Sequence, residues 1–234
     1  SIAQVQHVVS GLKLQVGAQP GLFNSAEEME TFKRKYNPTP FKKAIFQQGE
    51  RVAGFIGLDV GSTSTKAVLL NAEKEVLLKS YQLSKGNPID DTKQVLGDLL
   101  QQVKNQGATL EVVGIVTTGY AKDVIKDVLS ADDAIVETVA HTESAMHFYK
   151  DVDVICDVGG QDIKIMILKD GKVKDFKLNT QCSAGNGYFL QSTAFDFGLS
   201  VEQYAEEAFK AEKCPTFGFG CAVFLQSDIV SFQR

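Results

Sequence analysis

Two stretches of the sequence place an aspartate just before a glycine turn, and each follows an apolar run. They read Asp59-Val60-Gly61-Ser62 and Asp157-Val158-Gly159-Gly160. Glycine lets the backbone approach an anion closely, so that N–H groups of the turn can bind phosphate oxygens. Two carboxylates at the ends of neighbouring strands would hold a hydrated Mg²⁺ between phosphate groups. The pattern predicts a phosphate and magnesium site, and the absence of a GxxxxGK[ST] motif excludes a P-loop NTPase.

Side chains beside both turns extend the predicted site. Ser62, Thr63 and Thr65 offer hydroxyl donors, and Lys66 adds a positive charge. Gln161 follows the second turn, and its amide can orient water although it is a poor proton acceptor. A single Asp-x-Gly turn is usually structural, whereas two copies at equivalent places favour a shared binding function.

The elements that must position these turns form an internal repeat of three strands. The expected strands cover residues 54–59, 65–70 and 75–83 in the first copy, and 152–157, 163–168 and 173–178 in the second. Apolar spacing predicts further strands at 111–117 and 134–139, and helices at 89–106, 121–129, 142–149, 187–197 and 201–212. The mixture of strands and helices indicates an α/β protein.

The first fifty residues differ from the rest. Ser25 and Glu28 form a capping-box pattern that predicts a helix at 26–36, which the prolines of Asn37-Pro38-Thr39-Pro40 end. We expect residues 1–50 to be a lead-in or interdomain linker. Residues 51–151 would then form a first subdomain and 152–234 the start of a second, truncated one.

The cysteines allow more than one interpretation. Cys182 and Cys221 each stand in a glycine-rich stretch before an expected helix, where the helix dipole favours a thiolate. Such thiolates suit an iron–sulfur cluster if a two-fold dimer supplies both pairs, but small buried cysteines are also common. A zinc site that adds Cys214 is the other alternative, with no histidine near it in sequence. We expect Cys156 to lie in a core strand and His141 to cap a helix.

Composition narrows the class of protein. The 24 basic and 29 acidic residues leave a net charge of −5, so nothing indicates a nucleic-acid partner. No apolar run approaches the ~20 residues that cross a membrane. Four cysteines are too few for a disulfide scaffold, which favours a cytoplasmic location.

Six sequence segments resemble known proteins in order and spacing. The two aspartate turns resemble the phosphate motifs of the acetate and sugar kinase, heat-shock chaperone and actin ATPases. The chain from Gly54 to Arg234 resembles the BadF/BadG/BcrA/BcrD family, which activates 2-hydroxyacyl-CoA dehydratases. The segments are GLDVGSTSTKAVLL, TTGYAKD, ETVAHTESA, DVGGQDIKIM, NTQCSAGNGYFL and GCAVFLQSDIVS.

The resemblance implies a ribonuclease H-like, actin/sugar-kinase ATPase fold whose two halves close over Mg-ATP. In that family Cys182 and Cys221 would bind one 4Fe-4S cluster shared across a homodimer or a tandem-domain pair. ATP hydrolysis would drive one low-potential electron, received from ferredoxin or flavodoxin, into a CoA-ester dehydratase or reductase component.

The resemblance also implies roles for single residues. Asp59, Asp157 and Gln161 would be the catalytic group. The residues expected around the nucleotide are Gly61, Ser62, Thr63, Thr65, Lys66, Thr118, Gly119, Gly159 and Gly160.

The chain departs from the family at several places. Tyr188 stands where the family often has a basic residue, and Gln226 where it often has an acidic one. The family's second adenosine-binding motif would lie beyond Arg234, so we expect this chain alone to bind ATP weakly and to be inactive. The alternatives are a small-molecule kinase of the same fold and a nucleotide-switched interaction domain that has no cluster.

Overall fold

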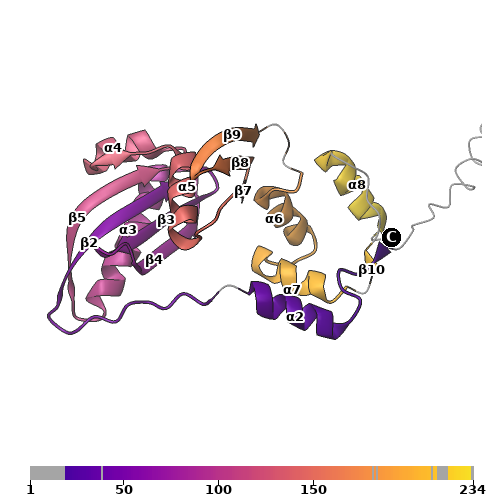
Figure 1. Cartoon of the computed structure of the whole chain (residues 1–234), viewed down its shortest axis with the longest axis horizontal. Helices are drawn as coiled ribbons and strands as arrows, with labels where there is room; N and C mark the ends of the chain where they lie inside the picture. The colour runs from indigo at the N-terminus through magenta and orange to yellow at the C-terminus, as the bar shows by residue number, and fades with distance from the viewer. Residues whose placement is uncertain are drawn as a thin grey trace, which may run out of the picture. The chain divides into compact units, whose positions relative to one another are not determined.

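A computed structural model describes residues 19–37, 39–180, 182, 184–211, 213–214 and 221–232 (Figure 1). The chain divides into two compact units. The larger is Pro40–Tyr188, and the smaller combines Ser1–Thr39 with Phe189–Arg234.

The larger unit begins with a five-stranded sheet in the order β4-β3-β2-β5-β6. Strands β2, β3 and β4 form the predicted antiparallel meander, while β5 runs parallel to β2 and β6 parallel to β5. The strands are β2 (Arg51–Val60), β3 (Ser64–Leu70), β4 (Val76–Leu83), β5 (Thr109–Thr118) and β6 (Asp133–Ala134).

Two helices cover one face of this sheet (Figure 1). They are α3 (Pro88–Lys104), with Asn87 as its N-cap, and α4 (Lys122–Leu129). Alternate residues of the strands point toward them, because side chains of a strand alternate between its two faces. The side chains packed there include Ile56, Leu58, Val60, Leu69, Leu78, Val95, Leu99, Val103 and Ile125. This core fixes the positions of β2 and β3, and the first aspartate turn connects the ends of these two strands.

The second predicted meander follows α5 (Glu137–Phe148). Strands β7 (Val154–Val158), β8 (Ile163–Lys169) and β9 (Lys172–Asn179) form an antiparallel sheet in chain order. Asp170 and Gly171 both have positive φ in the β8–β9 turn, as a tight hairpin requires. Helix α6 (Gly187–Asp196) starts soon after β9.

The smaller unit contains short helices and one short strand pair. Phe23 contacts Phe32 and Phe209, with ring centroids 5.3 and 5.9 Å apart, which packs α2 against α7. Its elements are α2 (Ala26–Tyr36), η1 (Val201–Gln203), α7 (Tyr204–Phe209), α8 (Ala222–Phe232), and β1 (Gln19–Pro20) paired with β10 (Lys213–Cys214). Across the described residues, no helix is long and apolar enough to cross a membrane.

The structure confirms both meanders, the helix at 26–36 and an α/β architecture, and it corrects several details. The expected strand at 134–139 shrinks to β6, and α5 begins at Glu137 rather than at residue 142. The β-branched residues Val136, Thr138 and Val139 suggested a strand. The helix instead brings Glu137 and His141, one turn apart, to the second meander, where both find charged partners.

Two smaller expectations are corrected. The helix expected at 201–212 begins with a 3₁₀ turn, η1, which continues directly into α7, and it ends at Phe209. Cys156 lies on β7 as predicted, but it is exposed rather than in the core.

Candidate functional site

The turns of the two meanders face one cavity in the larger unit, with a volume of about 470 Å³. Asp59, at the end of β2, and Asp157, near the end of β7, both line it. The structure thus brings together residues about a hundred positions apart in the chain. Of the sequence-predicted site residues, the cavity is lined by Asp59, Gly61, Ser62, Thr63, Lys66, Asp157, Gly159, Gly160 and Gln161.

The two turns have the same backbone bond. The Gly61 N–H donates to the carbonyl of Ser64 at 3.1 Å, and the Gly159 N–H donates to the carbonyl of Asp162 at 2.9 Å. The residue whose carbonyl accepts this bond is Ser64 in the first turn and Asp162 in the second. The repeat read from the sequence is therefore also a repeat of local geometry.

The turns contact each other directly. The Ser62 hydroxyl donates to Oε1 of Gln161 at 3.2 Å. A Cβ at Gly160 would lie 2.7 Å from the Cβ of Thr63, so a larger residue there would push the turns apart. Gly160 therefore leaves the space that Thr63 occupies at this contact.

Asp59 has an unsatisfied atom of the kind that a cation binds. Its Oδ2 accepts from Nζ of Lys66 at 3.0 Å. Its Oδ1 is buried and has no hydrogen-bond partner in the part of the chain that the structure describes. Gly119, with φ +87°, covers this atom so closely that a Cβ there would lie 2.5 Å from it. Since a buried carboxylate oxygen normally has a partner, this position fits a bound cation or one of its waters.

Asp157 is held by two groups at one oxygen. Nδ1 of His141 and Nζ of Lys164 lie 3.2 and 3.4 Å from its Oδ2. Lys164 also reaches Oδ1 of Asp162 at 2.8 Å and Oε1 of Glu137 at 3.4 Å. Burial lowers the pKa of Lys164, but the hydrogen bond to Asp162 and the charges of the three carboxylates raise it above its ordinary value overall. The ammonium is therefore charged and central to this group.

Sequence reasoning missed Glu137, Asp162 and Lys164, and it expected His141 only to cap a helix. One signal was available for Lys164, because each aspartate is followed by a lysine seven positions later. A second signal was the spacing of Glu137 and His141, which places both on one face of a helix.

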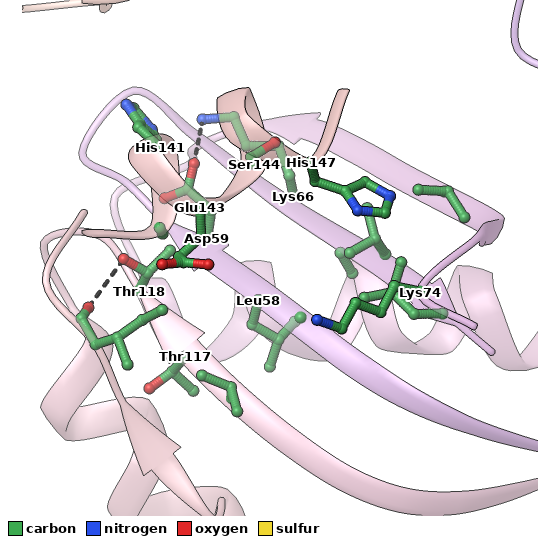
Figure 2. Close-up of a pocket in the computed structure, with 18 of the residues that line it drawn as sticks. Leu58, Asp59, Lys66, Lys74, Thr117, Thr118, His141, Glu143, Ser144 and His147 are labelled. Carbon is green, nitrogen blue, oxygen red and sulfur yellow. Dashed lines mark hydrogen bonds and ion pairs between the residues drawn. The ribbon is translucent and has the colours of Figure 1, made fainter. Parts of the chain in front are cut away.

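Other predicted residues lie elsewhere. Thr65 is fully buried on the face of β3 that packs under the helices. Thr118 donates to the Ile135 carbonyl at 3.0 Å and lines a neighbouring, mostly apolar cavity of about 650 Å³. Figure 2 shows that cavity, with Asp59, Lys66 and His141 at one end and Lys74 and His147 at the other.

The cysteines fall in different units. Cys182, in the larger unit, is half-buried, and its Sγ accepts from the Ala184 N–H at 3.4 Å. Cys221, in the smaller unit, directly precedes α8, and its carbonyl accepts from the Leu225 N–H. Their joint ligation of a cluster stays a prediction, and the side chain of Cys214, on which the zinc alternative depends, lies outside the described residues.

Comparison with known proteins places the site in a family context. Residues 56–234 match the BadF/BadG/BcrA/BcrD ATPase family. The uncharacterised protein MJ0004 of Methanocaldococcus jannaschii is 35% identical, over 75% of this chain and 68% of that protein. The (R)-2-hydroxyglutaryl-CoA dehydratase activating ATPase of Acidaminococcus fermentans is 29% identical, over 75% of this chain and 66% of the ATPase.

A solved structure has a similar fold. The activator of the 2-hydroxyisocaproyl-CoA dehydratase from Clostridium difficile, with bound ADPNP, superposes with a TM-score of 0.69 at 26% identity. The match covers 77% of this chain and 65% of the activator. The chain thus spans about two thirds of the length of the proteins that it matches.

Proposed function

Since the chain belongs to the BadF/BadG/BcrA/BcrD ATPase family, we propose that it binds Mg²⁺ and the phosphates of ATP in the cavity between the two turns. Hydrolysis of ATP there drives an electron from a 4Fe-4S cluster to a CoA-ester dehydratase or reductase component, with ferredoxin or flavodoxin as the donor. Relatives named as activators of such dehydratases support this kind of partner.

The observation that carries the proposal is the common cavity of Asp59 and Asp157. Two carboxylates that face the same space under glycine turns suit a hydrated magnesium ion between phosphate oxygens. The buried, unpartnered Oδ1 of Asp59 supports the same reading, because a cation or its water would supply the missing contact.

The charge of the cavity also favours a metal-bound nucleotide. Its lining includes four carboxylates, from Asp59, Glu137, Asp157 and Asp162, and two lysines, Lys66 and Lys164. The carboxylates outnumber the lysines, so the charge balance of the lining is negative and a bare triphosphate would be repelled. Magnesium, when bound, would neutralise this repulsion and polarise the phosphate oxygens.

The remaining residues of the cavity have separate roles in the proposal. Lys66, which is partly exposed, attracts the phosphates, and the N–H groups of the glycine turns bind their oxygens. Gln161, held by Ser62, orients the attacking water. Because an amide is a poor proton acceptor, this arrangement suits slow, conformationally controlled hydrolysis.

A chain of contacts links the phosphate turn to the cysteine segment. The carbonyls of Gly159 and Gly160 accept from the N–H groups of Gly187 and Tyr188, at 3.0 and 2.8 Å. These two donors begin helix α6, which follows Cys182 closely in the chain. A shift of the turn on nucleotide binding would therefore move the start of this helix.

The residues fit the proposed cluster in their donor chemistry. Two cysteine thiolates per chain make four across a two-fold dimer, and the Ala184 N–H already donates to Sγ of Cys182. The cluster, when bound, would supply the one-electron chemistry.

We also propose the division into residues 1–50, 51–151 and 152–234, with the cysteines in the last part.

Binding of inorganic triphosphate tests the phosphate site without depending on the adenosine. We expect calorimetry to detect binding in Mg²⁺ and none in EDTA, and a loss of at least about tenfold in affinity for Asp59→Asn. Asp98→Asn, on the exposed side of α3, is the matched control and should bind as the wild type does. Equal binding in EDTA, or by Asp59→Asn, would refute the proposal.

One observation favours the kinase alternative. Glu137 lines the cavity, and a kinase needs such a carboxylate as a base near the acceptor hydroxyl. Its Oε1 is, however, 3.4 Å from the Lys164 ammonium, so this oxygen already has an ion-pair partner and is not free for an acceptor hydroxyl. Transfer of ³²P from ATP to a sugar or small acid would select the kinase, whereas release of free phosphate selects the ATPase.

A further inference from the structure

The two meanders carry a lysine at the same position. Lys66 pairs across the strands with Asp59, and Lys164 pairs in the same register with Asp157. In each pair the ammonium lies near Oδ2 of its aspartate, at 3.0 and 3.4 Å. The repeat therefore supplies two equivalent lysines, one for each turn.

The surroundings of these lysines differ. The Lys66 side chain is 40% exposed, and among the described residues it contacts one carboxylate, that of Asp59. The Lys164 side chain is 8% exposed and contacts three, those of Glu137, Asp157 and Asp162. Part of the difference comes from one position, because the second turn has the charged Asp162 where the first turn has the neutral Ser64.

The carboxylates around Lys164 have the geometry of a metal site. Ligand atoms of Glu137, His141 and Asp157 all lie within 4.8 Å of one another. Carboxylate oxygens and an imidazole nitrogen are ligands that divalent ions such as Mn²⁺ accept. The ammonium of Lys164 contacts the oxygens of both acidic members, and it therefore occupies the place that a metal ion would need.

We propose that the Lys164 ammonium blocks a second divalent-metal site, which Glu137, His141 and Asp157 would otherwise form. The metal ion of the phosphate cavity is thereby confined to the space between Asp59 and Asp157. The statement about the metal ion of the phosphate cavity rests on the proposed function. The blocked site itself requires no nucleotide. Lys66, with its single partner, remains available to phosphate. The two equivalent lysines thus act on different groups, one on phosphate and the other on carboxylates.

This assignment explains why so many carboxylates stand beside a phosphate site. A second divalent ion at Glu137 and His141 would draw Asp157 toward those residues and away from Asp59, because its Oδ2 already faces them. A covalently attached ammonium neutralises the same carboxylates but cannot exchange with metal ions in solution. Lys164 therefore acts as a positioning residue for Asp157 and sets the number of metal ions at one.

The test measures binding of Mn²⁺ alone, by electron paramagnetic resonance of the free ion, to the full 234-residue chain. Lys164→Met, which keeps most of the stem and removes the charge, should bind one Mn²⁺ more than the wild type. The gained ion should bind about tenfold or more tightly than any ion on the wild type. Lys164→Arg keeps the charge, and Lys66→Met removes the equivalent lysine, so neither should gain an ion.

The double variant Lys164→Met with His141→Ala assigns the gained ion, and it should lose most of the gain. Failure of folded Lys164→Met to bind the extra ion would overturn the inference, as would an equal gain by Lys66→Met. If Lys164→Met unfolds, its circular dichroism is recorded with Mn²⁺; refolding supports the blocked site, and no refolding opposes it. Wild-type binding of Mg-triphosphate decides the proposed function separately.

Discussion

At the scale of single residues, glycine positions determine the shape of the site. Gly119 has φ +87°, and the space where its side chain would begin is taken by Oδ1 of Asp59 and the carbonyl of Val60. Gly160 likewise leaves room for Thr63. These positions were visible in the sequence as glycines near turns, but only the packing shows which atom each one admits. For Gly119 that atom is the unpartnered oxygen of a proposed metal ligand.

Gly119→Ala should therefore displace Asp59 and weaken Mg-triphosphate binding by about tenfold or more. Gly86→Ala is a matched control, since Gly86 has φ +85° and no described atom lies within 4 Å of where its Cβ would be. Both variants incur the backbone cost of a positive φ, about 1 kcal/mol. Calorimetric affinities that fall equally in both variants would contradict a specific contact with Asp59.

At the scale of elements, the first meander owes its position to the helix packed beneath it. Helix α3 presents Val95, Leu99 and Val103 to the sheet, and all three are buried. Its N-cap, Asn87, accepts from the backbone N–H groups of Ile89 and Asp90. The helical spacing and the cap could be read locally, so the sequence predicted this helix well. Helix α5 was predicted less well, because its first turn is stabilised by partners in a distant meander.

The adjacent residues Leu99 and Leu100 test this packing. Leu99 is fully buried, whereas Leu100 is 51% exposed on the other side of the helix. Leu99→Ala should lower the free energy of unfolding by roughly 2–5 kcal/mol, since it leaves a cavity in the core. Leu100→Ala should change it by about 0.5 kcal/mol or less. Urea unfolding followed by circular dichroism measures both, and equal losses would contradict the described core.

At the scale of the whole molecule, the phosphate cavity lies within one compact unit and the two cysteines are divided between two. The cavity could therefore form from local repeats that pack together. The cysteines differ in this respect, since Cys182 belongs to the larger unit and Cys221 to the smaller, and their joint ligation of a cluster remains a proposal. The start of α6 is bonded to Gly159 and Gly160, and it would connect the proposed phosphate site with the segment that carries Cys182.

Cys182→Ser should abolish iron binding after anaerobic reconstitution with iron and sulfide, because one ligand in each pair is lost. Cys156→Ser is the control, since Cys156 is exposed on β7 and has no role in the proposal. Iron and acid-labile sulfide are assayed, with molecular mass measured by anaerobic sedimentation. Unchanged iron in Cys182→Ser would contradict the cluster, and absence of iron from the wild type would favour a nucleotide switch without a cluster.

The strands of both meanders, their glycine turns and the aspartate before each turn could be predicted from the sequence, because they depend on contacts between near neighbours in the chain. Three features depend instead on how distant elements pack: Thr65 faces the core, α5 starts at Glu137, and the two equivalent lysines have different partners. The contact of Glu137 with Lys164 joins residues on separate elements, and such pairs form only when these elements pack. The local sequence pattern therefore predicts where a charged residue lies along a strand, whereas the packing of the elements determines which charged residues it contacts.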